Sequence, residues 1–69
     1  MKTRNYKTSG LQDMYDLFRH AKNGTKYAGS AAAGAYRRGL AGHPDRYIPT
    51  SLSQAAWAAG ADTRHDTLS

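Results

Sequence analysis

Three arginines and two tyrosines in the middle of the chain have the types and spacing of a nucleic-acid-binding surface. Tyr36 precedes the adjacent pair Arg37 and Arg38, and Arg46 precedes Tyr47. A guanidinium group can pair with a phosphate, and an aromatic ring can stack on an unpaired base. These five residues therefore predict an RNA site. The same residues would also form a solvated helix face whose tyrosines cover a thin core, so both interpretations stay open.

The charge of the whole chain favours the same class of partner. Its 69 residues contain 10 Lys and Arg against 5 acids, all of them Asp, for a formal net charge of +5. Such an excess favours a polyanion, although a basic surface without a specific partner has the same composition. Further cations would extend the patch from the N-terminal half: Arg19, Lys22, Lys26, Arg4 and Lys7.

Residues that could support catalysis or metal binding form no specific pattern. The three histidines, His20, His43 and His65, are dispersed without the spacing of metal ligands. The run Asn23-Gly24-Thr25-Lys26 lacks the full phosphate-loop pattern, and no strand precedes it. Pairs of Asp and His, such as Asp45 with His43, arise easily in polar loops. We therefore expect no catalytic residue, no cofactor and no metal.

Three short helices are predicted to position the basic residues. The first begins at Ser9, which stands in capping-box spacing with Gln12, and ends near Lys22 before Gly24. Large apolar residues recur along it at helical spacing, which predicts a face that packs in the core. They are Leu11, Met14, Tyr15 and Phe18, followed by Ala21.

The second and third predicted helices are rich in alanine. Ser30 caps the second, which runs to about Leu40; Gly39 and Gly42 end it and allow the next helix to pack close to its backbone. A loop through Pro44 and Pro49 follows. Ser51 and Gln54 form a second capping box, and the third helix runs to roughly Ala61, with Trp57 as a core plug or a contact residue.

These elements predict one all-α domain, a small bundle of three short helices without a sheet. Residues 1–8 are expected to form a flexible basic arm, residues 9–62 the helical domain and residues 63–69 a flexible tail. The absence of cysteine, of a long apolar run and of a secretory signal predicts a cytoplasmic protein that does not enter a membrane. The alanine faces also suit a homodimer.

Residues 34–64 contain three motifs at defined spacing. They are Tyr36-Arg37-Arg38-Gly39-Leu40-Ala41-Gly42, then Pro49, which closes a loop, and then Trp57-Ala58-Ala59-Gly60. This region resembles the ribosome modulation factor family of bacteria, which has a Y-x-x-G-x-A-G segment, a proline seven residues later and a W-x-x-G. The tryptophan here lies closer to the proline, a second tryptophan is absent and an N-terminal helix is added, which indicates a divergent member.

The resemblance implies a helical protein that binds ribosomal RNA and damps translation. A branch of the same family is described as drug-modifying phosphotransferases, so a small phosphotransferase that depends on Lys26 is another reading. The first alternative to RNA binding, ahead of the phosphotransferase, is a small inhibitor, encoded by a phage or a bacterium, that binds a host protein. Its contact residues would be Leu11, Met14, Tyr15, Phe18 or Trp57.

Overall fold

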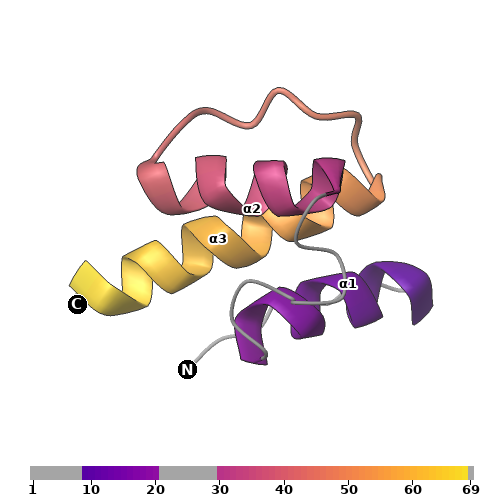
Figure 1. Ribbon diagram of the computed structural model, residues 1–69, viewed down its shortest axis with the longest axis horizontal. Coiled ribbons are helices and arrows are strands. Elements are labelled where there is room, and N and C mark those ends of the chain that lie inside the picture. Colours follow the sequence, from indigo (N-terminus) through magenta and orange to yellow (C-terminus); the bar gives the residue numbers. More distant parts are fainter. Residues whose placement is uncertain (1–8, 21–29, 69) are drawn as a thin grey trace.

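The computed structural model describes residues 9–20 and 30–68, apart from the side chains of Ser9 and Gly10. It contains the helices α1 (Ser9–His20), α2 (Ala31–Ala41) and α3 (Leu52–Leu68), and the described residues include no strand (Figure 1). The predicted all-α fold of three helices is therefore confirmed. None of the described helices is both long enough and apolar enough to cross a lipid bilayer. The predicted basic arm, residues 1–8, and the predicted helix stop at Gly24 lie outside the described residues.

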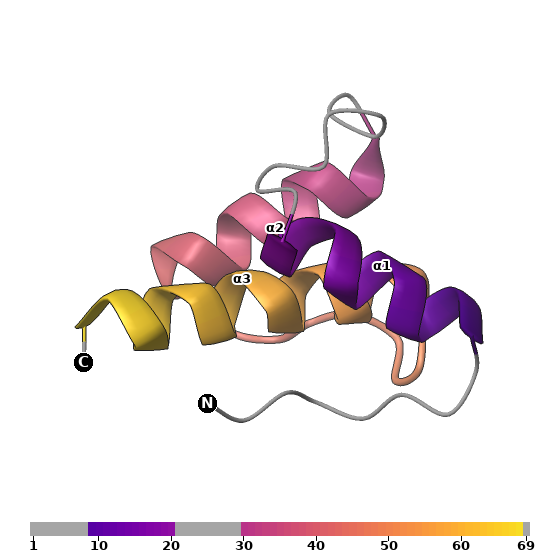
Figure 2. The same cartoon turned by 90° about the horizontal axis from the view of Figure 1, so that it is seen from below.

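Helices α2 and α3 cross with their backbones in direct contact, and they run in the same general direction (Figures 1 and 2). A Cβ atom added to Gly39 would lie 2.2 Å from the carbonyl oxygen of Trp57 and 2.8 Å from the amide nitrogen of Ala61. A Cβ atom added to Gly60 would lie 2.1 Å from the carbonyl oxygen of Tyr36. Each glycine thus leaves the space that the other helix's backbone occupies, which confirms the close packing predicted at Gly39.

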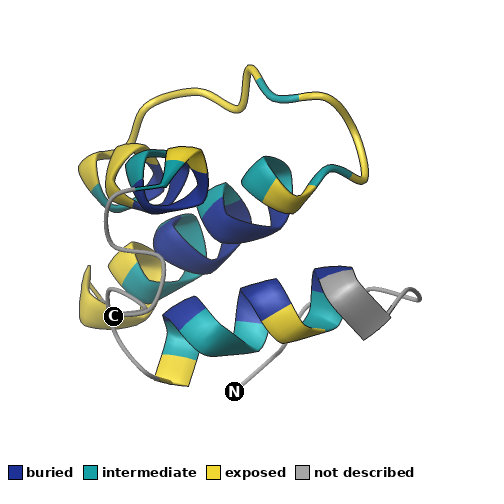
Figure 3. Cartoon of the chain, turned by 45° about the vertical axis from the view of Figure 1, so that its right-hand side comes forward, coloured by how far each residue is buried: buried dark blue, intermediate teal, exposed yellow. Residues whose placement is uncertain are grey.

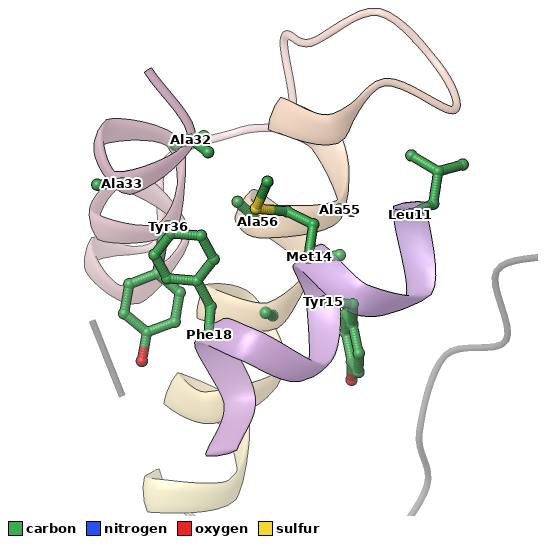
Figure 4. Close-up of a cluster of buried hydrophobic side chains, with 12 residues drawn as sticks. Leu11, Met14, Tyr15, Phe18, Ala32, Ala33, Tyr36, Ala55 and Ala56 are labelled. Atoms are coloured by element: carbon green, nitrogen blue, oxygen red, sulfur yellow. The ribbon is translucent and has the colours of Figure 1, made fainter. Parts of the chain in front are cut away.

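Helix α1 supplies the large side chains of the core. Tyr15 and Phe18 are fully buried, and Leu11 and Met14 are nearly so. The ring of Phe18 stacks on that of Tyr36 from α2, with centroids 4.9 Å apart (Figure 4). The other core residues are small and come from α2 and α3: Ala32, Ala33, Ala35, Ala55, Ala56, Ala58 and Ala59. The apolar stripe predicted for the first helix is therefore the part of the core that closes over these alanines.

Helix α3 is longer than the sequence predicts, because α1 holds its C-terminal half. The predicted end near Ala61 is wrong, since the helix continues to Leu68. The hydroxyl of Tyr15 donates a hydrogen bond to Asp62 at 2.6 Å, and Arg19 donates to Thr63 at 3.0 Å and forms an ion pair with Asp66. These contacts from α1 replace the interactions with water that would otherwise favour fraying of a polar helix end.

The ends of α2 follow the predicted capping residues. The Ser30 hydroxyl accepts a hydrogen bond from the amide of Ala33 at 3.3 Å. At the other end, Gly42 has a φ of 84°, and the amides of Gly42 and His43 donate to the carbonyls of Gly39 and Arg38. This pair of hydrogen bonds is a Schellman motif, which needs a residue with positive φ after the helix.

One of the two hydrogen bonds of the predicted capping box forms at the start of α3. The Ser51 hydroxyl accepts from the amide of Gln54 at 3.0 Å. The reciprocal bond differs, because the side-chain oxygen Oε1 of Gln54 accepts from the amide of Thr50, at 2.7 Å, and not from that of Ser51. Thr50, which donates this hydrogen bond, has a φ of 61°.

Candidate nucleic-acid interface

The five residues of the predicted RNA site divide between α2, which contains Tyr36, Arg37 and Arg38, and the loop that connects α2 to α3, which contains Arg46 and Tyr47. Because the two helices run in the same general direction, residues 42–51 must return along α2, and in Figure 1 this loop lies on the opposite side of the molecule from α1. Most of the loop is exposed (Figure 3). Pro44 and Pro49 favour the extended backbone that such a return requires.

Hydrogen bonds at His43, Asp45 and Tyr47 hold the middle of this exposed loop to the helices and to itself. The Trp57 indole donates to the carbonyl of His43 at 3.0 Å, and the Arg38 guanidinium donates to the hydroxyl of Tyr47 at 3.0 Å. Asp45 accepts with both carboxylate oxygens, from the amide of Tyr47 at 3.1 Å and from the side chain of Gln54 at 2.9 Å. The loop is therefore fixed to α2 through Arg38 and to α3 through Trp57 and Gln54.

An open pocket of about 520 Å³ lies between the end of α2 and the loop. Its lining residues are Arg38, His43, Pro44, Arg46 and Tyr47. Two of the three predicted arginines and one of the two predicted tyrosines thus come together around one cavity. The pocket combines guanidinium groups, an imidazole, an aromatic ring and a proline, a set that suits a flat, negatively charged ligand.

Arg37 lies on the helix beside this pocket without lining it. A Cβ atom added to Gly34 would be 3.9 Å from a terminal nitrogen of Arg37 and 3.5 Å from one of Arg38. Both guanidinium groups therefore lie over the same glycine on the solvent side of α2, where Arg37 and Arg38 are exposed. The exposed arginines of α2, Arg37 and Arg38, and Arg46 of the adjoining loop are together called the cationic surface below.

Arg64 is a further cation near this surface that the sequence analysis did not select. Its guanidinium carbon lies 3.3 Å from the position of a Cβ atom added to Gly42, so the group packs against the C-terminal turn of α2. The early end predicted for the third helix placed Arg64 in a flexible tail. A correct helix length would have placed it three turns after Leu52, on a helix that packs against α2.

Tyr36 and Arg19 are not part of the cationic surface. Tyr36 is only 5% exposed and its ring stacks on Phe18, so the predicted stacking of this ring on a base is replaced by a role in the core. The Arg19 side chain is 7% exposed and is paired with Asp66 on α3. Burial alone would lower the pKa of Arg19, but the hydrogen bond that Arg19 donates to Asp66 and the nearby Tyr15 and Asp62 raise this pKa, so the group stays charged.

The remaining predicted contact residues divide into two groups. Four of the predicted cations lie outside the described residues: Lys22, Lys26, Arg4 and Lys7. Lys26 is also the residue on which the phosphotransferase reading depends. The apolar residues of the inhibitor reading, Leu11, Met14, Tyr15 and Phe18, are buried under α1. Trp57 is half-buried against the core, and its indole nitrogen is bonded to the loop.

The cations of this surface have no carboxylate partners among the residues that the structure describes. Asp62 and Asp66 pair with α1, and Asp16 accepts a hydrogen bond from Gln12. Asp45 is the acid nearest the pocket, and its two oxygens accept the loop hydrogen bonds given above. None of the exposed guanidinium groups of α2 and the loop thus forms an ion pair with a described carboxylate.

Metal chemistry has no candidate centre in residues 9–20 and 30–68, where no group of three or more His or Asp side chains could hold an ion. Comparisons with protein-family models, with curated proteins and with solved structures gave no match to this chain.

Proposed function

We propose that this protein binds RNA through the cationic surface of α2 and the following loop. The observation that carries the proposal is the arrangement of Arg38, Arg46 and Tyr47 around one open pocket. Within the described part of the chain, neither guanidinium group forms an ion pair with a carboxylate. Arg37 and Arg64 would add phosphate contacts at its margins. The net charge of +5 favours the same kind of ligand.

Ribosomal RNA is the RNA that we propose as the target, with damping of translation as the consequence. The support for this choice is the motif resemblance of residues 34–64 to the ribosome modulation factor family. Several residues of those motifs have architectural roles in the fold: Gly39 and Gly60 form the helix crossing, Gly42 ends α2, and Trp57 holds the loop. The motif arginines 37 and 38 are left exposed on the surface.

Binding to a labelled RNA, measured by fluorescence anisotropy at increasing salt, tests the proposal. Each phosphate neutralised by the protein should contribute about 0.7–0.9 to the slope of log K against log salt concentration. The double variant Arg37→Ala/Arg46→Ala removes two exposed cations that form no hydrogen bond or ion pair with the residues that the structure describes. It should therefore lower the slope by roughly 1.4–1.8 and weaken binding.

The matched control is Arg37→Lys/Arg46→Lys, which keeps the charge and removes the planar, two-pronged donor. It should keep the wild-type slope and lose part of the affinity. Binding that is absent at low salt, or that is unaffected by the alanine variant, would refute the proposal. Cosedimentation with ribosomal particles through a sucrose gradient, compared for the wild type and the alanine variant, tests the ribosomal target separately.

A further inference from the structure

We propose that the pocket between the end of α2 and the loop takes one unpaired nucleotide, so that the protein selects single-stranded RNA over duplex RNA. This inference rests on the proposed RNA binding and names the form of RNA that the site accepts. It depends on three properties of the pocket, which are its size, the fixed position of Tyr47 and the placement of the cations.

The size of the pocket suits a ligand larger than a phosphate. Its volume of about 520 Å³ lies within the range of roughly 300–1,000 Å³ typical of small-molecule sites. A phosphate contact alone needs only an exposed guanidinium group, which Arg37 already offers. The cavity therefore has room for a sugar and a base beside the phosphate that the arginines attract.

Tyr47 is held as a preformed wall of this pocket. Its hydroxyl accepts a hydrogen bond from Arg38, its amide donates one to Asp45, and its side chain packs partly against the core. A ring fixed at both ends loses little entropy when a base stacks on it. Arg38 uses one of its five N–H donors in this contact, and the other donors could bind a phosphate.

The cations of the pocket come from two different elements. Arg38 comes from α2, Arg46 directly precedes Tyr47 on the loop, and both line the cavity together with His43 and Pro44. A nucleotide whose base lies against Tyr47 would thus have guanidinium groups within reach of its phosphate, as sites for single-stranded nucleic acid commonly do.

Duplex RNA cannot use such a pocket. In an A-form helix the bases are stacked and paired, and proteins reach mainly phosphates and 2′-hydroxyls. A purely cationic surface would favour the duplex, because duplex phosphates are denser and release more counterions than those of a single strand. A preference for the single strand is therefore a specific sign that a base enters the pocket.

The test measures the affinity of the full chain for two RNAs of the same length at one salt concentration. One RNA is an unstructured single strand and the other is a duplex. The wild type should bind the single strand more tightly. Tyr47→Ala should weaken single-strand binding by roughly 5- to 100-fold, the range expected for the loss of one base–aromatic stack, and leave duplex binding unchanged. Tyr47→Phe keeps the ring and should keep the preference for the single strand. Arg37→Ala, outside the pocket, should weaken the binding of both RNAs by a similar factor.

Preference of the wild type for the duplex, or equal losses for both RNAs in a folded Tyr47→Ala protein, would overturn the nucleotide pocket and leave the proposed RNA binding intact. Absence of binding to either RNA would instead refute the proposed function. Should Tyr47→Ala lose its helical circular dichroism, an NMR titration of the wild type decides. Adenosine monophosphate should shift the Tyr47 ring resonances in a saturable way and inorganic phosphate should not, and unmoved ring resonances with both probes would overturn the inference.

Discussion

Replacing Gly39 with alanine adds one methyl group at the point where α2 and α3 touch. The new carbon would lie 2.2 Å from the carbonyl oxygen of Trp57 and 3.1 Å from the carbonyl carbon of the same residue. Both are backbone atoms of a helix, so no side-chain rotation can make room. The two helices must move apart, and the alanine contacts between them loosen together.

The size of the effect follows from two opposing contributions. Overpacking of a core costs about 1–3 kcal/mol, and the upper end applies here because the clash is with backbone. Alanine in a helix interior is favoured over glycine by about 1 kcal/mol, which offsets part of that cost. The net loss is about 2 kcal/mol, which lowers the melting temperature of a domain of this size by roughly 8–16 °C.

The same helix contains its own control at Gly34. A Cβ atom added there would meet only the ends of Arg38 and Arg37, at 3.5 and 3.9 Å, which are ordinary contact distances. Gly34→Ala should therefore gain most of the helix propensity, about 0.5–1 kcal/mol. Two identical substitutions, five residues apart in α2, should change stability in opposite directions.

Thermal and urea unfolding followed by circular dichroism at 222 nm measures both variants. Gly39→Ala should unfold at a lower temperature and lower urea concentration than the wild type, and Gly34→Ala at higher values. Gly60→Ala should resemble Gly39→Ala, since the space that each glycine leaves is filled by the other helix's backbone. A Gly39→Ala protein that is as stable as Gly34→Ala would refute the backbone-to-backbone crossing.

Two further substitutions test the ends of the helices. Gly42→Ala should destabilise the protein by about 1–2 kcal/mol, because Gly42 has a φ of 84°, and Gly42→Asn should cost less in the same unfolding experiment, since asparagine tolerates this conformation. In a double-mutant cycle of Arg19→Met and Asp66→Asn, the coupling energy should be below about 1 kcal/mol and should shrink at high salt, because Asp66 is 45% exposed; a larger coupling that salt leaves unchanged would contradict this picture.

Features that depend on neighbouring residues could be predicted from the sequence. Ser30 caps α2 and Gly42 ends it because each acts on backbone groups within five residues of itself. The alanine runs form helices by intrinsic propensity, and the absence of alternating apolar residues excludes strands. The close approach at Gly39 was also predictable, since only a residue without a side chain permits it.

Features that depend on distant residues could not be predicted in this way. The end of α3 is set by Tyr15 and Arg19, which lie more than forty residues before their partners Asp62 and Asp66. The polar composition of residues 63–69 favours a frayed helix end when it is considered without these contacts from α1. The same contacts place Arg19 in an interface between helices and remove it from the predicted RNA site.

The burial of Tyr36, by contrast, could have been predicted from the helical periodicity of the sequence. Successive residues of a helix point about 100° apart, so Tyr36 and Arg37 cannot share one face of α2. Tyr36 follows Ala32 by four residues and Ala33 by three, which places it on the buried alanine face. Tyr47, which stands in a loop, escapes this constraint and lies beside Arg46 at the pocket.

The helix crossing and the pocket depend on the same few residues, although they lie on different sides of α2. Arg38, which holds Tyr47, directly precedes Gly39 at the crossing. Trp57 presents its carbonyl to Gly39 and, through its indole, holds the loop at His43. A displacement of α2 from α3 therefore moves both anchors of the loop apart. The contact between these two helix backbones therefore supports the pocket as well as the core, and this explains why glycine is needed on the side of α2 that faces away from the pocket.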